Sequence, residues 1–405
     1  MNRHILIAFA ASLGMGVAFL NLTPVLPALR DFYGVSNARM GVLITALILT
    51  HSLVQIPAGL VVDRMGVRTG VLLALGLGFL GNILSIFSQD FNFILAMRLL
   101  TGIGTGLSFV AGIHYATAHA RDEQKIQVQA IFGGLINTGS MLPFFASPIL
   151  LGYDVRLIYL FTALIFFLPL LAVLIWGEDP EKKESVSRTP LRQVLMSRPA
   201  WALGFSHAVF FGGMMAIGTW ISSYLMRSPA SLPGFSWVGV VGGVVIGISA
   251  IGRFLGAFTF PWIHPRTLIP WALVLLFLSY GGLGMGGGLG LGLVLLSLAA
   301  LMNSVTFGSV FFLAYQTVSA ENAGTAIGLV NFIASIGAFL FPVVFGYFID
   351  LTGTFSLSFF FLAALALACL YPLLSLSPTR KIRKRYLPQT KIGSRLQRDS
   401  DLPPP

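Results

Sequence analysis

The residues best suited to carry chemistry are ionisable side chains that lie within long apolar stretches. Arg98 and Arg253 lie inside such stretches, whereas the fourteen Asp and Glu residues fall in polar segments or at the ends of apolar ones. An ionisable group in hydrocarbon costs several kcal/mol, of order 3, so it is a candidate for function by default. A buried guanidinium needs an anionic partner and fits carboxylate-like planes. The two arginines therefore predict a binding site for a small anion, with Arg253 as its main ligand.

Both arginines also have a structural interpretation. Arg253 could simply bond backbone carbonyls at the cytoplasmic end of its helix, and Arg98 could bond helix carbonyls or the side chain of Asn21. Roles in solute binding or gating and roles in helix packing therefore both stay open for this pair.

Three histidines also lie in apolar stretches, and histidine is the side chain that titrates near neutral pH. His207 and His51 are therefore candidates to carry a coupled proton. A polar group satisfied within a packed helix seam is an equally open interpretation of His51. His114 lies near the end of its stretch, where an interfacial position is expected.

Neutral side chains could complete the site. Gln55 precedes Gly59 by the same offset that separates Arg253 from Ala257, so it occupies the equivalent place in the first half of the chain. Polar side chains in membrane helices also hydrogen-bond between helices, so each has a structural alternative. The other candidates for substrate contacts are Asn21, Asn303 and Trp220, with Asn137, Gln316, Asn331, Tyr224 and Tyr315 as further members of its wall.

These residues are positioned by a chain whose composition requires a bilayer. Hydrophobic residues make up 56% of 405 positions and charged residues only 10%, against about 25% charged in soluble domains. A spanning helix needs about 20 apolar residues. The sequence predicts an all-α integral membrane protein with twelve transmembrane helices, at 5–27, 40–62, 69–88, 91–117, 127–150, 155–177, 199–226, 237–262, 268–286, 288–319, 323–349 and 354–377.

The polar stretch in the middle of the chain divides these helices into two pseudo-symmetric six-helix bundles. We expect bundles at 1–177 and 199–378, joined by a cytoplasmic linker at 178–198 and followed by a basic cytoplasmic tail at 379–405. This topology places nineteen of the 25 Lys and Arg residues on the cytoplasmic side, as the positive-inside rule requires. The net charge of +11 thus reflects topology, and no nucleic-acid partner is expected. The single cysteine, Cys369, rules out an intramolecular disulfide.

The segment Gly59-Leu-Val-Val-Asp63-Arg64-Met-Gly66-Val-Arg68 resembles the cytoplasmic loop signature of the major facilitator superfamily, G-x-x-x-D-R-x-G-R-R. Gly59 permits close helix approach, Asp63 can accept from helix N-terminal amides, and Gly66 supplies the turn. Arg64 and Arg68 can pair with acids or headgroups. These contacts can form and break as two bundles rock, so we interpret the motif as conformational.

The resemblance implies a secondary transporter with rocker-switch alternating access. Facilitators of monocarboxylates, oxalate and nitrate are similar in placing a substrate arginine in their eighth helix, where Arg253 lies, which favours anion transport, with symport of a proton through histidine as an option. The second half lacks the Asp-Arg pair, and the fifth helix lacks the clean signature of drug/proton antiporters. A drug or metabolite exporter with an apolar cavity and a non-transporting receptor or assembly protein are the alternatives.

An enzyme is not expected, because no catalytic triad, metal-ligand spacing or nucleotide-binding motif stands out, and neither a metal nor a cofactor is predicted. The glycine-rich run at 281–292 lacks the Lys-Ser/Thr of a phosphate loop and indicates a close helix hairpin. We expect a monomer in a bacterial cytoplasmic membrane, with the lipid bilayer and a small anion as its partners.

Overall fold

The computed structural model describes residues 2–179, 194–227, 235–258, 262–316 and 323–374, and every structural statement below refers to these ranges. All regular elements in them are helices. Twelve helical segments are long and apolar enough to cross a membrane, which confirms the predicted fold class. The predicted tail at 379–405 and most of the predicted linker at 178–198 lie outside the described residues.

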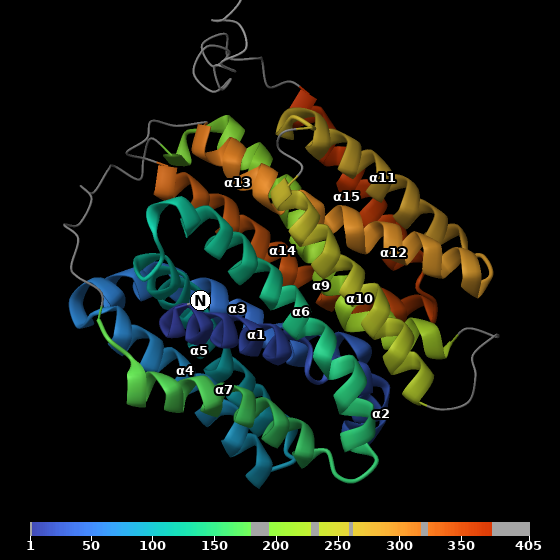
Figure 1. The fold of residues 1–405 in the computed structure, drawn as a ribbon. Coiled ribbons are helices and arrows are strands. Elements are labelled where there is room, and N and C mark those ends of the chain that lie inside the picture. The colour runs from blue at the N-terminus through green and yellow to red at the C-terminus, as the bar shows by residue number, and fades with distance from the viewer. Residues whose placement is uncertain (1, 180–193, 228–234, 259–261, 317–322, 375–405) are drawn as a thin grey trace, which may run out of the picture.

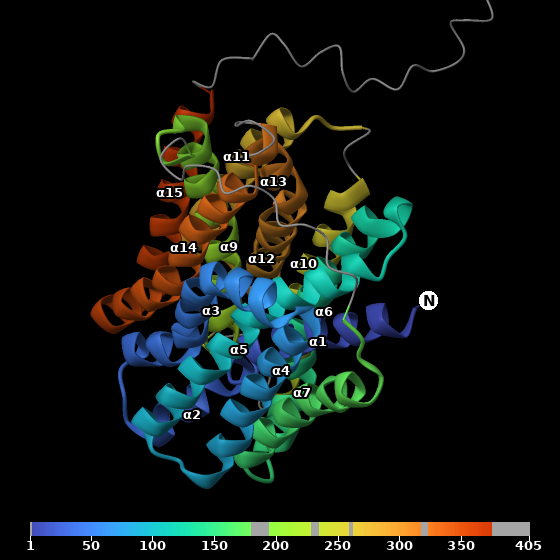
Figure 2. The same cartoon turned by 90° about the vertical axis from the view of Figure 1, so that its left-hand side faces the viewer.

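The helices separate into two groups that follow chain order (Figure 1). The blue-to-green group that ends with α7 lies on one side and the light-green-to-red group that begins with α9 lies on the other, and the same separation is visible after a 90° turn (Figure 2). The first group contains α1 (Arg3–Leu20), α2 (Leu26–Tyr33), α3 (Asn37–Met65), α4 (Val67–Leu84), α5 (Phe91–Ala118), α6 (Lys125–Leu151) and α7 (Arg156–Trp176). The second contains α9 (Arg198–Met226), α10 (Phe235–Phe258), α11 (Pro265–Met285), α12 (Leu289–Val305), α13 (Phe307–Gln316), α14 (Ala323–Thr352) and α15 (Ser356–Leu374).

Two predicted spans are broken in the structure. The first span contains a 3-10 turn at Thr23–Val25 between α1 and α2, and Pro24 and Pro27 lie at the N-termini of the turn and of α2. Proline is tolerated at the first helical positions because it removes an amide that would be unsatisfied there. The span predicted at 288–319 consists of α12 and α13, which meet at Thr306.

The glycine-rich run at 281–292 contains the turn between α11 and α12. Gly286 and Gly287 have φ values of +84° and +151°, which are strained for residues with a Cβ. The close hairpin expected from the sequence is therefore a turn that requires glycine at both positions.

The two groups of helices meet along two seams, where α3 packs against α14 and α6 packs against α10. The α3–α14 seam is tight at the end that carries Asn37. A Cβ added to Gly41 would lie 2.8 Å from the Pro342 carbonyl oxygen, and one added to Gly346 would lie 2.5 Å from that of Asn37. Toward the other end of α3, a Cβ on Gly59 would meet no atom of the described residues within 4 Å. This seam is thus closed at its Asn37 end and open toward its Asp63 end.

The closed end of the seam is held by Asp350 at the end of α14. One carboxylate oxygen accepts from the Asn37 backbone N–H at 3.0 Å and from the Asn37 side-chain amide at 2.6 Å, and the other accepts from the Ala38 N–H at 2.9 Å. A carboxylate is stabilised at a helix N-terminus by free amides and by the helix dipole. Asp350 therefore caps α3 from the opposite group of helices.

The Gly59–Arg68 motif forms the turn between α3 and α4. Asp63 and Arg64 are exposed, and Gly66 has a φ of +88°. The Arg68 backbone N–H donates to Asp179 at 2.8 Å, and its guanidinium donates to the Leu174 carbonyl at 3.3 Å. The motif thus contacts the end of α7 in this structure, and its conformational role stays a prediction.

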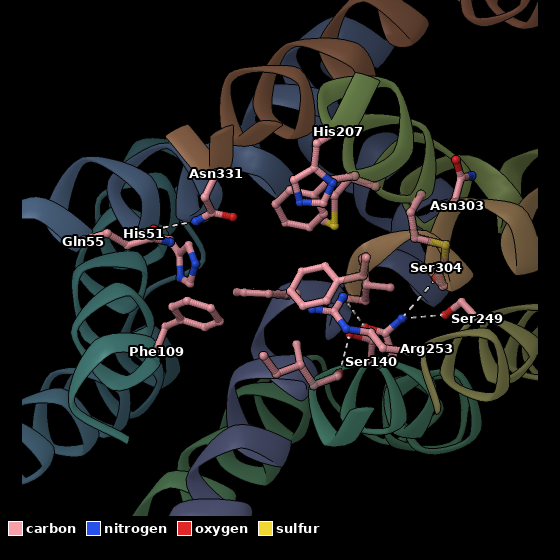
Figure 3. Close-up of a pocket in the computed structure, with 18 residues that line it drawn as sticks. His51, Gln55, Phe109, Ser140, His207, Ser249, Arg253, Asn303, Ser304 and Asn331 are labelled. Carbon is pink, nitrogen blue, oxygen red and sulfur yellow. Dashed lines mark hydrogen bonds between the residues drawn. The ribbon is translucent and has the colours of Figure 1, made fainter. Parts of the chain in front are cut away.

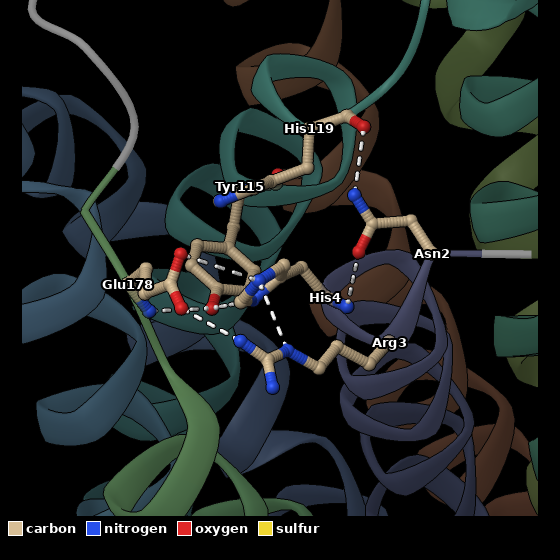
Figure 4. Close-up of polar contacts among 6 residues, drawn as sticks. All are labelled: Asn2, Arg3, His4, Tyr115, His119 and Glu178. Atoms are coloured by element: carbon tan, nitrogen blue, oxygen red, sulfur yellow. Dashed lines mark hydrogen bonds and ion pairs between the residues drawn. The ribbon is translucent and has the colours of Figure 1, made fainter.

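A polar cluster joins the start of α1 to the ends of α5 and α7 (Figure 4). The Arg3 guanidinium pairs with Glu178 at 2.6 Å, and His4 Nδ1 lies 2.8 Å from the Tyr115 hydroxyl. His119 stacks on His4 with the ring centroids 4.2 Å apart. Arg3 and Glu178 are both more than half exposed, so their ion pair adds little stability, and the cluster mainly orders the chain where it leaves α7.

Candidate functional site

A cavity lies between the two groups of helices and is lined from both of them (Figure 3). It contains about 780 Å³ of empty space, including the part open to solvent. One wall carries His51 and Gln55, and Arg253 lies across the cavity from them. The lining residues are Phe19, Leu20, His51, Gln55, Phe109, Ile136, Asn137, Ser140, His207, Phe211, Met214, Met215, Ser249, Arg253, Asn303, Ser304, Phe307 and Asn331.

Arg253 is the charged side chain of this lining, and it is half-buried. Its Nη1 donates to Asn137 Oδ1 at 3.3 Å, and its guanidinium carbon lies 3.4 Å from the centroid of the Phe307 ring. Its Nε is buried without a hydrogen-bond partner in the described structure. The lining contains no Asp or Glu among the described residues, so no carboxylate there balances the guanidinium charge.

Asn137 is oriented for its contact with Arg253 by two serines. Its side-chain amide donates to Ser249 Oγ at 3.1 Å and to Ser304 Oγ at 3.4 Å, which directs its oxygen toward the guanidinium. Asn137 comes from α6 and both serines come from the second group of helices. The network therefore holds Arg253 of α10 against α6, across the α6–α10 seam.

Gln55 and Asn331 form a hydrogen bond across the α3–α14 seam. The Asn331 amide donates to Gln55 Oε1 at 2.5 Å, while Gln55 Nε2 is buried without a partner among the described residues. Asn303 donates to the Tyr280 hydroxyl at 2.8 Å, and its own Oδ1 also lacks a described partner. A buried polar atom left unpaired costs about 1–3 kcal/mol, so both amides have hydrogen-bonding capacity for a solute.

His207 reaches the cavity from α9 and is buried among aromatic rings. Its centroid lies 5.1 Å from that of Phe311, 5.7 Å from that of Phe307 and 6.3 Å from that of Phe211. Its Nδ1 is buried and has no partner in the described part of the chain. Phe307 thus contacts both His207 and Arg253.

His51 lines the cavity from α3 in a different environment. Its Nδ1 lies 3.2 Å from the Thr105 hydroxyl, and its ring makes edge contacts with Phe19 and Phe109 at 5.2 and 6.0 Å. His51 therefore has the polar partner that His207 Nδ1 lacks. His114, by contrast, is exposed and lies outside the cavity lining.

Arg98 does not line the cavity, and its hydrogen-bonding capacity is used within the first group of helices. Its guanidinium donates at 2.8 Å to the carbonyls of Ala18 and Ile44 and to Asn21 Oδ1. Longer bonds reach the carbonyls of Leu43 and Phe19. This geometry is the structural interpretation that the sequence left open for Arg98.

Several other predicted contacts also lie away from the cavity. Asn21 is buried, and its amide donates to the Thr162 hydroxyl at 3.1 Å. Trp220 is buried in α9, and its Nε1 donates to the Pro342 carbonyl at 2.8 Å. Gln316, Tyr224 and Tyr315 are not part of the lining either.

Sequence reasoning missed the apolar part of the lining and its serines. Phe307 is the most consequential omission, because it carries the cation–π contact with Arg253. Phe307 and Phe311 are separated by four positions, which is the spacing of one helix face, but this pattern equally fits lipid-facing residues. The serines Ser140, Ser249 and Ser304 gave no signal distinct from ordinary interhelical contacts.

The chain was compared with known proteins. A family model described as Major Facilitator Superfamily matches residues 5–342 and confirms the family that the loop motif predicted. A nitrite extrusion protein of Bacillus subtilis is 26% identical over 80% of this chain and 82% of its own length. The probable sulfoacetate transporter SauU of Cupriavidus necator is 24% identical over 89% and 92%. The quinolone resistance protein NorA of Staphylococcus aureus is 20% identical over 86% and 91%.

Solved structures show the same fold. A bacterial homologue of the human lysosomal transporter Spinster, in an inward-facing and occupied conformation, matches with a TM-score of 0.74. The match covers 91% of this chain and 95% of the other, at 15% sequence identity. At this identity the likeness concerns the fold alone.

Proposed function

We propose that this chain, which belongs to the major facilitator superfamily and is a multi-pass membrane transporter and not an enzyme, moves a small anion. The observation that carries the proposal is the environment of the Arg253 guanidinium. Its guanidinium faces a cavity whose described lining has no carboxylate, and its Nε has no hydrogen-bond partner there. A guanidinium in such a site is stabilised by an anion with two or more acceptor oxygens.

The neutral part of the lining supports a small oxyanion in particular. Gln55 Nε2 is an unused donor on the wall that faces Arg253, so an anion between them would accept hydrogen bonds from both groups of helices. Two of the similar proteins are named for nitrite, a small oxyanion, and for sulfoacetate, which carries a carboxylate and a sulfonate group. We therefore favour a single planar or tetrahedral oxyanion group as the moiety that is bound.

The transport mechanism that fits this site is rocker-switch alternating access. The cavity lies between the two groups of helices, and the α3–α14 seam is closed at the Asn37 end and open toward the Asp63 end. With both termini cytoplasmic, the open end faces the cytoplasm. We further propose bundles at 1–177 and 199–378, a monomeric state and a location in the bacterial cytoplasmic membrane.

Uptake by proteoliposomes tests this function. Nitrate, nitrite and sulfoacetate would be supplied to vesicles that contain the parent protein, Arg253→Gln or Arg156→Gln. Arg156 is an exposed arginine at the start of α7 and serves as the matched control. Because a hydrogen bond to a charged group is worth about 1.5–3 kcal/mol, Arg253→Gln should raise the KM for the transported anion at least tenfold, while Arg156→Gln should not. Unchanged anion uptake by Arg253→Gln would overturn the proposal.

Export of a larger apolar solute is the second candidate. It is favoured by the aromatic and methionine side chains of the lining, namely Phe19, Phe109, Phe211, Met214 and Met215, and by the similarity to NorA. Under this function Arg253 would only orient Asn137 and stack on Phe307. Protection of cells by the chain against quinolones, with no flux of any oxyanion, would favour export.

A further inference from the structure

His207 is a titratable group that the proposed anion site does not use. It is buried, its ring is surrounded by Phe211, Phe307 and Phe311, and its Nδ1 has no described partner. An unpaired polar atom in an aromatic environment is costly, and His207 lines a cavity that is partly open to solvent. The geometry therefore provides a proton site beside the anion site.

The charges that face His207 are few. Of the elements that pack against α9, α10 supplies Arg253 to the cavity, and α12, α13 and α14 supply only neutral side chains to its described lining. The other elements that contact α9, namely α2, α15 and the turn at Thr23–Val25, supply no residue to that lining. Across the cavity, α3 supplies His51, which is the other titratable group of the lining. Phe307 contacts both His207 and Arg253, so an imidazolium at His207 and the guanidinium would lie in one small site.

Two like charges in a site without a carboxylate disfavour each other. An anion bound between them removes this penalty, because it attracts both cations. We infer that His207 binds a proton together with the anion, so that the transporter carries one anion and one proton in the same step. This inference rests on the proposed anion function and adds the coupling ion to it.

The geometry selects His207 over His51 for this role. The Nδ1 of His51 lies 3.2 Å from the Thr105 hydroxyl, which satisfies it in the neutral ring. His51 also lies on the wall opposite Arg253 (Figure 3). The Arg253 guanidinium therefore repels a proton on His51 less directly than a proton on His207. A proton on His207, by contrast, depends on the anion.

Thermodynamic linkage between the proton and the anion predicts a change in anion affinity with pH that can be measured. If the anion raises the proton affinity of His207 by some factor, the proton raises the anion affinity by the same factor. Coupling between two sites is typically 5- to 150-fold, so the Kd for nitrate should weaken by roughly this factor as the pH rises from about 5 to 8. Nitrate is a suitable probe because it does not itself titrate in this range.

The test measures nitrate binding and proton uptake on the purified full-length protein. Nitrate is added to concentrated protein in weakly buffered solution, and proton uptake is followed with a pH indicator, while calorimetry gives Kd as a function of pH. The parent protein should take up protons when nitrate binds. His207→Gln should still bind nitrate but should take up no proton and show a flat pH dependence. His51→Gln should still take up a proton when nitrate binds, and the exposed His114→Gln should behave like the parent.

Three results would overturn the inference. Nitrate binding to the parent without proton uptake would exclude coupling, and this measurement does not depend on the folding of any variant. Loss of proton uptake in His51→Gln and not in His207→Gln would assign the proton to His51, on the opposite wall of the cavity. Absence of binding of any anion at every pH would instead refute the proposed function, and the coupling with it.

Discussion

Removal of the Asp350 carboxylate should shift the balance between the two ends of the α3–α14 seam. Asp350→Ala deletes three hydrogen bonds to Asn37 and Ala38 that join the two groups of helices. A helix cap contributes about 0.5–2 kcal/mol, and a charge at a helix N-terminus contributes about 0.3–1 kcal/mol. Because Asp350 is exposed, we expect a combined loss of about 1–2 kcal/mol, which corresponds to a roughly 5- to 30-fold change in the ratio of two states.

The shift can be measured as a distance between two spin labels at the Asn37 end of the molecule. Tyr153, which follows α6, and Met285, at the end of α11, are each 81% exposed, so cysteines at these positions would be readily labelled. In a bilayer, Asp350→Ala should increase the population with a long interlabel distance.

The matched control is Asp90→Ala. Asp90 also caps a helix, because it accepts from the Phe93 N–H at 2.8 Å, but this cap lies within one group of helices. Its loss should reduce stability without changing the interlabel distance. If Asp350→Ala leaves the distance distribution of the parent unchanged, or if Asp90→Ala changes it equally, Asp350 does not hold the seam closed.

Two further predictions concern stability. Arg98→Gln should lower the melting temperature and the yield of folded protein, because it removes the hydrogen bonds from the guanidinium to carbonyls of α1 and α3, at about 1.5–3 kcal/mol for each bond to a charged group. A melting temperature equal to that of the parent would contradict this role. Gly139→Ala should separate α1 from α6, because the new Cβ would overlap the Leu13 carbonyl oxygen. The new Cβ of Gly281→Ala meets no atom of the described residues within 4 Å, so this variant should leave the melting temperature unchanged. Equal thermal shifts for the two glycine variants would refute this packing argument.

The fold was largely predictable because the bilayer imposes a simple rule on the sequence. Each spanning segment must satisfy its backbone internally and present apolar side chains, so twelve apolar runs predict twelve helices. The breaks at Asn21–Val25 and Thr306 were not predicted, because the residues on both sides of each break are equally apolar. Hydropathy does not show where a helix axis changes direction. Pro24 was a visible signal for the first break, whereas nothing comparable marks the second.

The site was less predictable than the fold. The type of a residue indicates the free-energy cost of placing it in a membrane, but it does not indicate whether the side chain points into the cavity or toward a neighbouring helix. Arg98 and Arg253 have the same side chain in similar apolar surroundings. Helix carbonyls surround Arg98, whereas among the described residues Arg253 donates to a side chain, Asn137 of α6. That difference arises from which helices pack together, and a single sequence does not encode it in a local pattern.

The surroundings of Arg98 have a consequence for solutes that never touch it. Carbonyl groups and the Asn21 amide solvate the guanidinium, but as neutral dipoles they leave its net charge uncancelled. Phe19, whose carbonyl accepts one of these bonds, also contributes its side chain to the cavity lining. In a medium of low dielectric constant the electrostatic potential of a monopole extends well beyond its hydrogen bonds. We therefore expect the charge of Arg98 to disfavour cations in the cavity as a class, whereas under the proposed function the groups in contact with the solute select among anions.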